Sequence, residues 1–444
     1  DPHIVKKDMV KGKIDVISMG CSKNLIDSEK LLKRLEAKGY SVSHDSEHPE
    51  GEYVVVNTCG FIADAKEESI NLLLELAESK QRGEIGKIVV MGCLSQRYMD
   101  QLKAEMPEID IWYGKFDWKD FIGTLPDKKG EASPREWERS LTTPPHSAFL
   151  KISEGCNRFC AFCAIPLITG RHTSRPIEEI LEETRSLVEK GVKEFNIIAQ
   201  DLSSYGLDLY GEHKLPELID KMADIKGVEW IRLHYAYPSD FPMELLDVMA
   251  RKDNVCKYID IALQHISDPV LKNMRRHIDS RQTKDLLREM RKRVPGLKIR
   301  TTLMVGFPGE TNEGFEELLE FVKTERFDRM GAFAYSEEDD TYAAKNLPDT
   351  IPDEVKQERL ERLMTLQEEI AMEEAEKMVG SELKLLVDEL DGDIRICRSQ
   401  WDSPDVDCAY YVSDTDAMPG DYIMASIKEA RSPFDFEARF LSKL

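Results

Sequence analysis

Three cysteines lie within eight residues of the sequence, in the segment CNRFCAFC at 156–163. Cys156, Cys160 and Cys163 have a C-x3-C-x2-C spacing. A structural zinc ion usually takes four protein ligands, and so does a 4Fe-4S cluster that is held entirely by cysteine. Three thiolates leave one iron of such a cluster open to a substrate or cofactor. The alternatives are a zinc knuckle with a distant fourth ligand and plain buried cysteines. The spacing, the position after a predicted strand and the barrel pattern around the segment disfavour both.

A second set of three cysteines is spread along the first hundred residues. Cys21, Cys59 and Cys93 stand in SMGCSKN, VNTCGFI and MGCLSQR, and each follows a short β-branched run. The carboxyl ends of parallel strands meet at one edge of a sheet, so these thiols are expected to converge. The alternative is three unrelated core cysteines, which are common in buried strands. Recurrence at the same place in each unit favours a second cluster, again with one open iron.

The elements around the second set predict a small α/β domain over residues 1–124. Buried strands are expected at 13–19, 53–58 and 87–91, because each is a short apolar run. Amphipathic helices are expected at 24–38, 64–80 and 95–105. Alternating strands and helices indicate a parallel sheet. The polar, proline-rich stretch 125–147 that follows is interpreted as a linker.

A second alternation predicts a barrel over residues 148–351. Its candidate strands share a short, apolar character and are 148–153, 194–200, 229–236, 258–264, 298–305 and 329–335. Helical patterns lie between them, for example at 176–190 and 280–293. About six βα units indicate a partial or full parallel (β/α) barrel. The C-x3-C-x2-C segment would then lie at the mouth of this barrel.

The last ninety residues no longer alternate between strand and helix patterns. Residues 352–379 form a charged helical pattern whose apolar positions are three or four apart, which predicts a connecting helix with one packed face. Five short β runs then fill residues 380–444, and they predict a small antiparallel β-barrel. The whole chain is therefore α/β, with a parallel N-terminal domain, a (β/α) barrel and a C-terminal β-barrel.

The amino-acid composition limits the kinds of binding partner and the cellular compartment that can be expected. The 444 residues hold 61 Lys and Arg against 84 Asp and Glu, a formal net charge of −23, which argues against non-specific binding to nucleic acid or to a membrane surface. No run of about 18 apolar residues predicts a membrane span, so a cytoplasmic protein is expected. Disulfides are not expected in a reducing compartment. Cys256, Cys397 and Cys408 have no partner spacing and are interpreted as structural.

The segment at 156–163, in this context, resembles the radical S-adenosylmethionine (SAM) superfamily. The resemblance implies that the cofactor chelates the open iron and is cleaved by one-electron reduction. It also implies that Phe162 packs near the adenine. Further cofactor contacts are expected from the strand ends at Gln200, Gln264 and Gly306, with Asp201 and His265 beside them. Arg300 is expected to pair with the methionyl carboxylate.

The two cysteine sets together resemble the methylthiotransferase family over nearly the whole chain, through NTCGFI, GCLSQRY and CNRFCAFCAIP. The resemblance implies an N-terminal cluster domain, a radical barrel and a C-terminal TRAM domain. It implies two 4Fe-4S clusters on the six cysteines, with S-adenosylmethionine as the other cofactor and no catalytic residue beyond the cluster ligands. It also implies an electron donor such as flavodoxin or ferredoxin.

Two branches of that family compete. One modifies isopentenyladenosine in transfer RNA (MiaB-like), and the other modifies an aspartate of the twelfth small-subunit ribosomal protein (RimO-like). The segments GCSKNLIDSE at 20–29 and ALQHIS at 262–267 look like the second.

Residues 381–444 hold seven Lys or Arg and fourteen Asp or Glu, so their net charge is 7 − 14 = −7. An RNA-binding domain needs a basic face, whereas this one suits a basic ribosomal protein. No stable nucleic-acid partner is therefore expected. A third hypothesis, a non-enzymatic iron–sulfur carrier, is disfavoured by the full barrel pattern.

Overall fold

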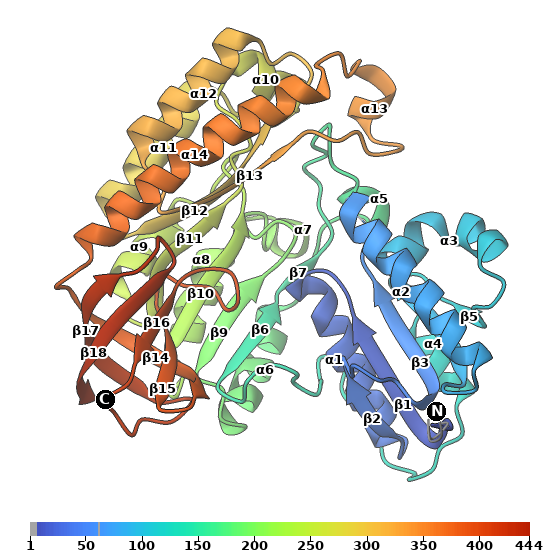
Figure 1. Ribbon diagram of the computed structural model, residues 1–444. Coiled ribbons are helices and arrows are strands. Elements are labelled where there is room, and N and C mark those ends of the chain that lie inside the picture. The colour runs from blue at the N-terminus through green and yellow to red at the C-terminus, as the bar shows by residue number, and fades with distance from the viewer. Residues whose placement is uncertain (1–6, 61–62) are drawn as a thin grey trace, which may run out of the picture. The chain divides into compact units, whose positions relative to one another are not determined.

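The computed structural model describes residues 7–60 and 63–444, whose elements divide between two compact units (Figure 1). Unit 1 holds the chain as far as Thr142 together with Ala164–Arg171. Unit 2 holds Thr143–Cys163 and His172–Leu444. The sequence assigned residues 164–171 to the barrel, but in the structure this segment packs with unit 1.

Unit 1 is a parallel five-stranded sheet between two helical layers. The strand order is β2-β1-β3-β4-β5, with strands β1 (Val10–Ser18), β2 (Ser41–His44), β3 (Gly51–Thr58), β4 (Lys87–Gly92) and β5 (Ile111–Trp112). The helices are α1 (Ser22–Ala37), α2 (Ala63–Gln81), α3 (Cys93–Glu105), α4 (Lys119–Thr124) and α5 (Ile165–Thr169). The three strands and three helices expected from the sequence are all present, and β2 and β5 extend the sheet at its two edges.

Alternation along the strands explains the two layers. Val55 packs with α1 and α4 in one apolar cluster, whereas its neighbours Val54 and Val56 pack with α2 and α3 in another. Side chains of consecutive strand residues point to opposite faces, so a strand covered on both faces is apolar throughout. This is why the central strands have continuous apolar runs in the sequence.

Residues 125–146 contain no helix or strand, but they are not a free connector. Arg139 is buried and forms an ion pair with buried Glu29 of α1, at 2.6 Å between Nη1 and Oε1. The backbone N–H of Thr142 donates to the other oxygen of Glu29 at 2.8 Å. The polar composition that suggested a solvated linker thus includes a buried ion pair with α1.

The first part of unit 2 is a partial barrel. Its six strands are all parallel and lie in chain order, β6-β9-β10-β11-β12-β13. They are β6 (Ser147–Lys151), β9 (Glu194–Ile198), β10 (Trp230–Ala236), β11 (Val255–Ile261), β12 (Lys298–Val305) and β13 (Arg329–Ala334). A short antiparallel pair, β7 (Ser153–Glu154) and β8 (Thr173–Ser174), extends beyond β6. The sheet is open, so the expected barrel is partial rather than full.

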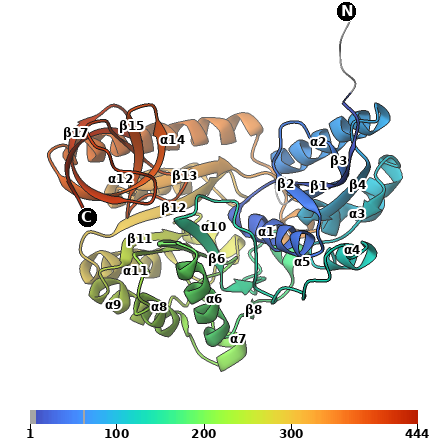
Figure 2. The ribbon, with the colours of Figure 1, turned by 90° about the horizontal axis from the view of Figure 1, so that it is seen from below.

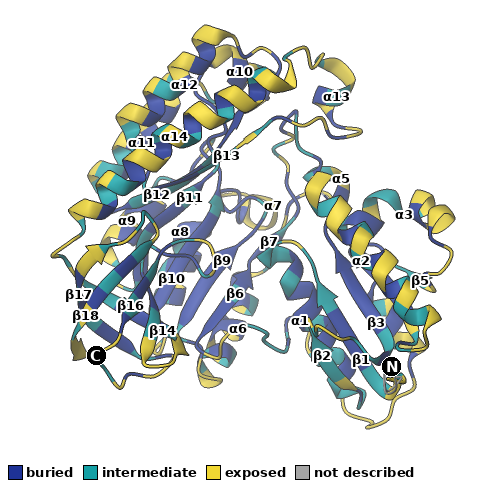
Figure 3. Ribbon diagram, viewed as in Figure 1, coloured by how far each residue is buried: buried dark blue, intermediate teal, exposed yellow. Residues whose placement is uncertain are grey.

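Helices cover one face of this sheet and present charged outer surfaces. They are α6 (Ile177–Glu189), α7 (Leu207–Tyr210), α8 (Leu215–Ala223), α9 (Glu244–Arg251), α10 (Asp268–Asn273), α11 (Ser280–Arg293), α12 (Asn312–Glu325) and α13 (Tyr342–Asn346). Figure 3 shows the strands buried and the outer helix faces exposed. The connecting helix is confirmed as α14 (Asp353–Lys377), which packs beside α12 and β13. No helix in the described part of the chain is long and apolar enough to cross a membrane.

The C-terminal segment forms a closed five-stranded barrel, seen end-on in Figure 2. Its strands are β14 (Glu382–Asp391), β15 (Ile394–Ser399), β16 (Ala409–Val412), β17 (Tyr422–Ala430) and β18 (Asp435–Lys443). The five expected strands are confirmed. The expectation of a wholly antiparallel barrel is wrong at one place, because β16 and β18 pair in parallel and close the ring.

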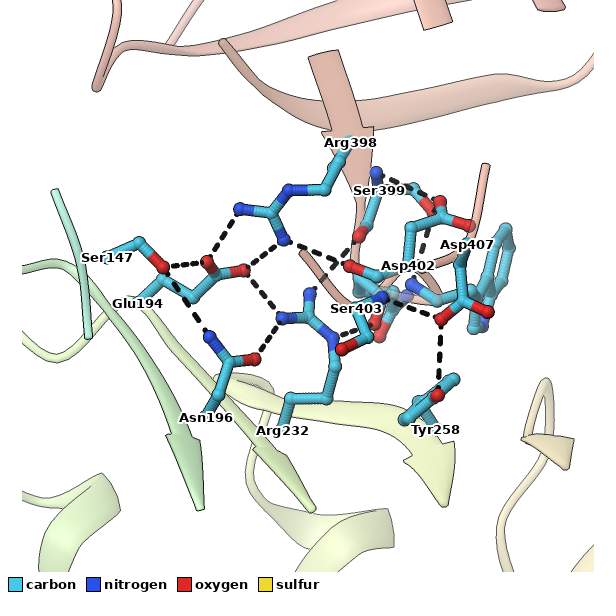
Figure 4. A network of polar contacts seen from close by, with 12 residues as sticks. Ser147, Glu194, Asn196, Arg232, Tyr258, Arg398, Ser399, Asp402, Ser403 and Asp407 are labelled. Atoms are coloured by element: carbon cyan, nitrogen blue, oxygen red, sulfur yellow. Dashed lines mark hydrogen bonds and ion pairs between the residues drawn. The ribbon is translucent and has the colours of Figure 1, made fainter. Parts of the chain in front are cut away.

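A buried network of charged groups joins the C-terminal barrel to the amino-terminal ends of the parallel strands (Figure 4). Glu194 is the first residue of β9 and is fully buried. It accepts two hydrogen bonds from Arg398 of β15, at 2.6 and 2.7 Å, and one from Arg232 of β10 at 2.6 Å. Ser147 of β6 donates a fourth at 2.5 Å. Two buried cations from different domains therefore share one carboxylate.

The loop between β15 and β16 continues this junction. Asp402 accepts from Arg329 of β13 at 2.9 Å, and Asp407 pairs with Arg300 of β12. Tyr258 of β11 also donates to Asp407, at 3.2 Å. The C-terminal barrel thus covers the end of the partial barrel at which β9, β12 and β13 begin.

Candidate iron–sulfur sites

The three N-terminal cysteines lie where β1, β3 and β4 finish. Cys21 is the residue before α1, Cys59 directly follows β3, and Cys93 is the first residue of α3. A Cβ on Gly20, whose φ is +89°, would stand 2.7 Å from Cys59 Sγ. The absence of a side chain at Gly20 therefore lets the end of β1 approach the second thiol, as the parallel topology predicted.

Asn24 of α1 holds these strand ends together. Its Nδ2 donates to the carbonyl of Met19 at 2.8 Å and to that of Thr58 at 3.2 Å. Asn57 of β3 donates back to the Asn24 carbonyl at 2.8 Å. These contacts give a structural role to Asn24 of the GCSKNLIDSE segment.

The electrostatics of this edge suit thiolates that bind a cation. Burial raises the pKa of Cys93 to about 11, and the nearby Cys59 and Cys21 add to the increase. Burial also acts to raise the pKa of Cys21, but Lys23 and the N–H of Asn24 outweigh it and the pKa is lowered. A bound metal offsets the cost of ionising buried thiols. The residues therefore fit an iron–sulfur cluster.

Buried polar atoms without a partner support that fit. Ser22 Oγ, Asn24 Oδ1 and Asn57 Oδ1 all lack a hydrogen bond within the described residues. Such atoms are rare in native proteins and call for an explanation, often an ion or other group that completes the site. Phe61 and Ile62 of the NTCGFI motif lie outside the described residues.

The C-x3-C-x2-C loop follows β7, at the carboxyl end of the parallel sheet. The first turn of this loop depends on Gly155. Its φ of +84° lies in the left-handed region, which glycine adopts more readily than other residues. The Gly155 N–H donates to Gln200 Oε1 at 3.0 Å, and Gln200 Nε2 donates to Glu154 at 3.1 Å. Gln200, expected to contact the cofactor, is thus seen to hold the start of the loop.

Further contacts fix the middle of the loop. Arg158 Nε donates to buried Asp201 at 2.8 Å, and its guanidinium lies over the ring of Tyr237 at 4.7 Å. Asn157 accepts from the backbone N–H of His172 at 3.0 Å. Asp201 is therefore a support for the loop.

The central thiol, Cys160, is contacted by two polar side chains. Arg276 donates from Nη1 to Cys160 Sγ at 3.2 Å, and the Tyr237 hydroxyl forms a hydrogen bond with the same sulfur. The next residue, Ala161, donates its N–H to the carbonyl of Met274 at 2.9 Å. Neither Tyr237 nor Arg276 was singled out by sequence reasoning, because no motif spacing marks them.

Phe162 lies on an apolar wall of the site. Its ring meets Phe307 edge-on at 6.1 Å, and Phe307 packs in the same way on Tyr335 at 4.9 Å. Phe162 is half-buried, whereas Phe307 and Tyr335 belong to the core. An aromatic surface next to the C-x3-C-x2-C loop, called the cluster loop below, is consistent with the expected packing of Phe162 near an adenine.

Gln264 lies at the end of β11 with its side chain turned inward. Its φ is +69° and its Oε1 is buried without a hydrogen-bond partner in the described part of the chain. Its neighbour His265 is fully buried and bonds to Glu310 at 2.6 Å. Gln264 therefore remains a candidate cofactor contact, while His265 is a structural residue.

Two expected cofactor contacts are corrected by the structure. Arg300 lies near the start of β12 and pairs with Asp407 of the C-terminal barrel, at the opposite end of the sheet, so it is not placed to pair with the methionyl carboxylate. Gly306 has a φ of +76°, and a Cβ there would meet Lys356 Cγ of α14 at 2.3 Å. The side chain of Lys356 thus covers the open face of Gly306 that was expected to face adenosine.

The remaining singled-out residues have structural surroundings. Cys256 packs with Trp230 and Tyr422 at the junction with the C-terminal barrel, and Cys397 and Cys408 lie in the core of that barrel. Among the histidines, His234 is buried against Tyr258 and His277 is exposed.

Buried atoms without partners also gather around the cluster loop, as expected of a site for a polar ligand. They are Ser153 Oγ, Arg158 Nη2, Gln264 Oε1, Arg276 Nε and Tyr335 Oη. Burial raises the pKa of Cys156 to about 12. In the described residues no three His, Cys, Asp or Glu side chains are grouped around a single metal ion. In a 4Fe-4S cluster each cysteine binds its own iron, and the three thiols on one supported loop fit that arrangement.

Comparison with family models divides the chain into three parts. Residues 13–114 match uncharacterized protein family UPF0004, residues 150–322 match the radical SAM superfamily, and residues 379–441 match the TRAM domain. The matches agree with the N-terminal α/β domain, the partial barrel and the C-terminal closed barrel.

Curated relatives are similar over nearly their whole length. A protein of Phocaeicola vulgatus named ribosomal protein uS12 methylthiotransferase RimO is 59% identical over 401 residues, which cover 90% of this chain and 92% of the relative. The protein of the same name from Bacteroides thetaiotaomicron is 55% identical over 439 residues, 98% of this chain and all of the relative.

Solved structures support the fold. The radical SAM methyltransferase TsrM of Kitasatospora setae aligns with a TM-score of 0.54 at 15% identity, over 86% of this chain and 79% of its own. The cobalamin-dependent radical SAM enzyme OxsB aligns with a TM-score of 0.52 at 14% identity, over 80% of this chain and 56% of its own.

Proposed function

Because the chain belongs to the family of ribosomal protein uS12 methylthiotransferases, RimO, we propose that it transfers a methylthio group to the β-carbon of an aspartate of that ribosomal protein. The observation that carries the proposal is the pair of three-cysteine sites, one at the sheet edge of unit 1 and one on the loop after β7. Each supplies three thiolates and so leaves one iron of a cluster open. One open iron suits the cofactor, and the other suits a sulfur species.

The two sites have different tasks in this proposal. Cys156, Cys160 and Cys163 hold a 4Fe-4S cluster, which when bound supplies the electron that cleaves S-adenosylmethionine to a carbon-centred radical. Gln200 and Asp201 fix the loop that carries these thiols, and the wall of Phe162 and Phe307 keeps water from the cofactor.

In unit 1, Cys21, Cys59 and Cys93 would hold the second 4Fe-4S cluster, which would present the sulfur that is transferred. Asn24 maintains the spacing of the strand ends that carry them. The electron comes from a low-potential donor protein such as a flavodoxin or ferredoxin.

The C-terminal domain is proposed to bind the basic protein substrate. Within it, eight of the acidic residues are exposed against four of the basic ones, a balance of 4 − 8 = −4. Arg398 is buried against Glu194 and adds nothing to the surface charge. The β14–β15 hairpin alone exposes Glu389, Asp391 and Asp393. Such a surface attracts a basic protein and repels phosphates.

The competing function is the methylthiolation of isopentenyladenosine in transfer RNA. Anaerobically reconstituted, reduced protein with S-adenosylmethionine is offered the ribosomal protein and the transfer RNA in separate reactions. We expect mass spectrometry to find the methylthio addition on an aspartate of the protein. Addition on the RNA alone would refute the substrate assignment and leave the two-site chemistry in place.

The number of clusters needs its own test. Iron and acid-labile sulfide are measured on the reconstituted full chain, on the variant with Cys21, Cys59 and Cys93 replaced by alanine, and on the variant with the other three replaced. We expect about eight irons in the first and about four in each of the others, because each site holds one 4Fe-4S cluster. An unchanged iron content in the variant that lacks Cys21, Cys59 and Cys93 would contradict a cluster in unit 1.

A further inference from the structure

Arg276 is a buried cation without an anionic side chain to pair with. It is 1% exposed, and across residues 7–60 and 63–444 no Asp or Glu forms an ion pair with it. Its contacts are Cys160 Sγ at 3.2 Å from Nη1, the carbonyl of Ala262, and the ring of Tyr237 at 4.1 Å. Nε has no partner in this part of the chain. Burying an unpaired charge is costly, so the negative charge that offsets it must come from Cys160 and what it binds.

The backbone that carries Arg276 is shaped to bring it inward. The residues on either side, Arg275 and His277, have φ values of +57° and +58°, which only a minority of non-glycine residues adopt. Such conformations persist where the surrounding structure enforces them, and they gather at functional sites. The turn is fixed to the cluster loop, because the Met274 carbonyl accepts the N–H of Ala161 at 2.9 Å.

Tyr237 positions the guanidinium. Its ring is in contact with the guanidinium groups of Arg276 and Arg158, at 4.1 and 4.7 Å from the ring centroid, and its hydroxyl reaches the same sulfur as Arg276. Cys160 is therefore contacted by two donor-bearing side chains from different elements. Cys156 Sγ, in contrast, accepts a hydrogen bond from a backbone group, the N–H of Arg158, at 3.4 Å.

We propose that Arg276, oriented by Tyr237, is a positioning residue that donates a charge-assisted hydrogen bond to the Cys160 thiolate and so makes the cluster on this loop easier to reduce. Reduction adds one electron, from the low-potential donor protein, and hence one negative charge to the cluster and its thiolates. A fixed buried cation and a hydrogen bond to a ligand sulfur both stabilise the more negative state. The proposal rests on the proposed function for the presence of that cluster.

The test compares the midpoint potential of this cluster in three variants. Arg276→Gln removes the charge, Arg276→Lys keeps the charge but loses the planar fork, and Arg275→Gln is the matched control. Arg275 is the exposed neighbour, stacked on Tyr342, and within the described residues its side chain forms no hydrogen bond or ion pair with the loop. All are made in the full chain with Cys21, Cys59 and Cys93 replaced by alanine, so that one cluster is measured.

Redox titration followed by electron paramagnetic resonance is done without S-adenosylmethionine. For Arg276→Gln we expect the equilibrium constant for one-electron reduction to fall at least tenfold, about 59 mV to more negative potential. We expect a smaller fall for Arg276→Lys and none for Arg275→Gln. Iron content of each sample reports whether the cluster is present, which separates this test from failure of the proposed function.

Three results would overturn the proposal. The first is an unchanged potential in both Arg276 variants at full iron content. The second is an equal shift in Arg275→Gln, which would assign the effect to overall charge. If the Arg276 variants weaken S-adenosylmethionine binding with no change in potential, the guanidinium serves the cofactor carboxylate instead, and that too contradicts the proposal. If Arg276→Gln does not fold, the Arg276→Lys result decides.

Discussion

Replacing Glu194 by glutamine tests the buried junction between the partial barrel and the C-terminal barrel. Glu194 is 0% exposed and accepts four hydrogen bonds, three of them from Arg398 and Arg232. Glutamine removes the negative charge and places an amide donor against guanidinium donors. Breaking a buried ion pair from one side costs about 3–5 kcal/mol. Since two cations lose their shared partner, we expect a loss toward the upper end of that range.

The assay is urea unfolding of the full chain, followed by hydrogen exchange of the peptides that cover β14 and β17. These peptides report the unfolding free energy of the C-terminal barrel itself. Glu437→Gln is the control, because its ion pair with Arg431 is largely exposed and such pairs contribute about 0–1 kcal/mol. A loss in Glu194→Gln no larger than in Glu437→Gln would refute the reasoning. A double-mutant cycle with Arg398→Met then measures the coupling across the junction.

Three further predictions follow from the same contacts. Burial acts to raise the pKa of Glu194, Asp388 and Asp402, but Arg398, Arg232, His146 and Arg329 outweigh it and hold each pKa below its usual range. A carboxylate whose pKa is lowered by folding stabilises the folded state at pH values above its unfolded-state pKa. We therefore expect acid titration to show a free energy of unfolding that is constant above about pH 5 and falls below about pH 4.5, less steeply in Glu194→Gln. Gly306→Ala, at a φ of +76° and against Lys356, should cost about 1–3 kcal/mol in urea unfolding, and a loss under 0.5 kcal/mol, roughly the level of a neutral surface change, would contradict the strain. Asn24→Ala should weaken iron binding by the unit 1 site about 10–100-fold in a chelator competition and leave the other site unchanged; equal weakening of both would contradict the local role of Asn24.

Much of the fold is predictable because the strands have strong local signals. The buried runs at 53–58 and 87–91 are apolar on both faces, as a strand between two helical layers requires. Cys59 directly follows β3, Cys93 directly follows β4, and the C-x3-C-x2-C segment lies in the loop after β7. The C-terminal strands were equally clear. The parallel pairing of β16 with β18 could not be predicted, because it depends on how the ring closes and leaves no mark in either strand.

Side-chain roles were less predictable where they depend on distant partners. Arg300 stands on a barrel strand and looked available, but its partner Asp407 is 107 residues away in the sequence. Gly306 looked like space for a ligand until α14 supplied Lys356. Arg276 and Tyr237 carry no spacing signal because they meet at Cys160 only in three dimensions.

The most direct test of the two-site account is a single comparison of Cys59→Ala and Cys160→Ala with the unaltered protein. Each reduced protein receives S-adenosylmethionine with a deuterated methyl group and the ribosomal protein, and 5′-deoxyadenosine and the labelled methylthio adduct are measured by mass spectrometry. The account predicts both products from the unaltered protein, 5′-deoxyadenosine without adduct from Cys59→Ala, and neither from Cys160→Ala. A labelled adduct from Cys59→Ala at the unaltered level would contradict the assignment of the sulfur to the unit 1 site.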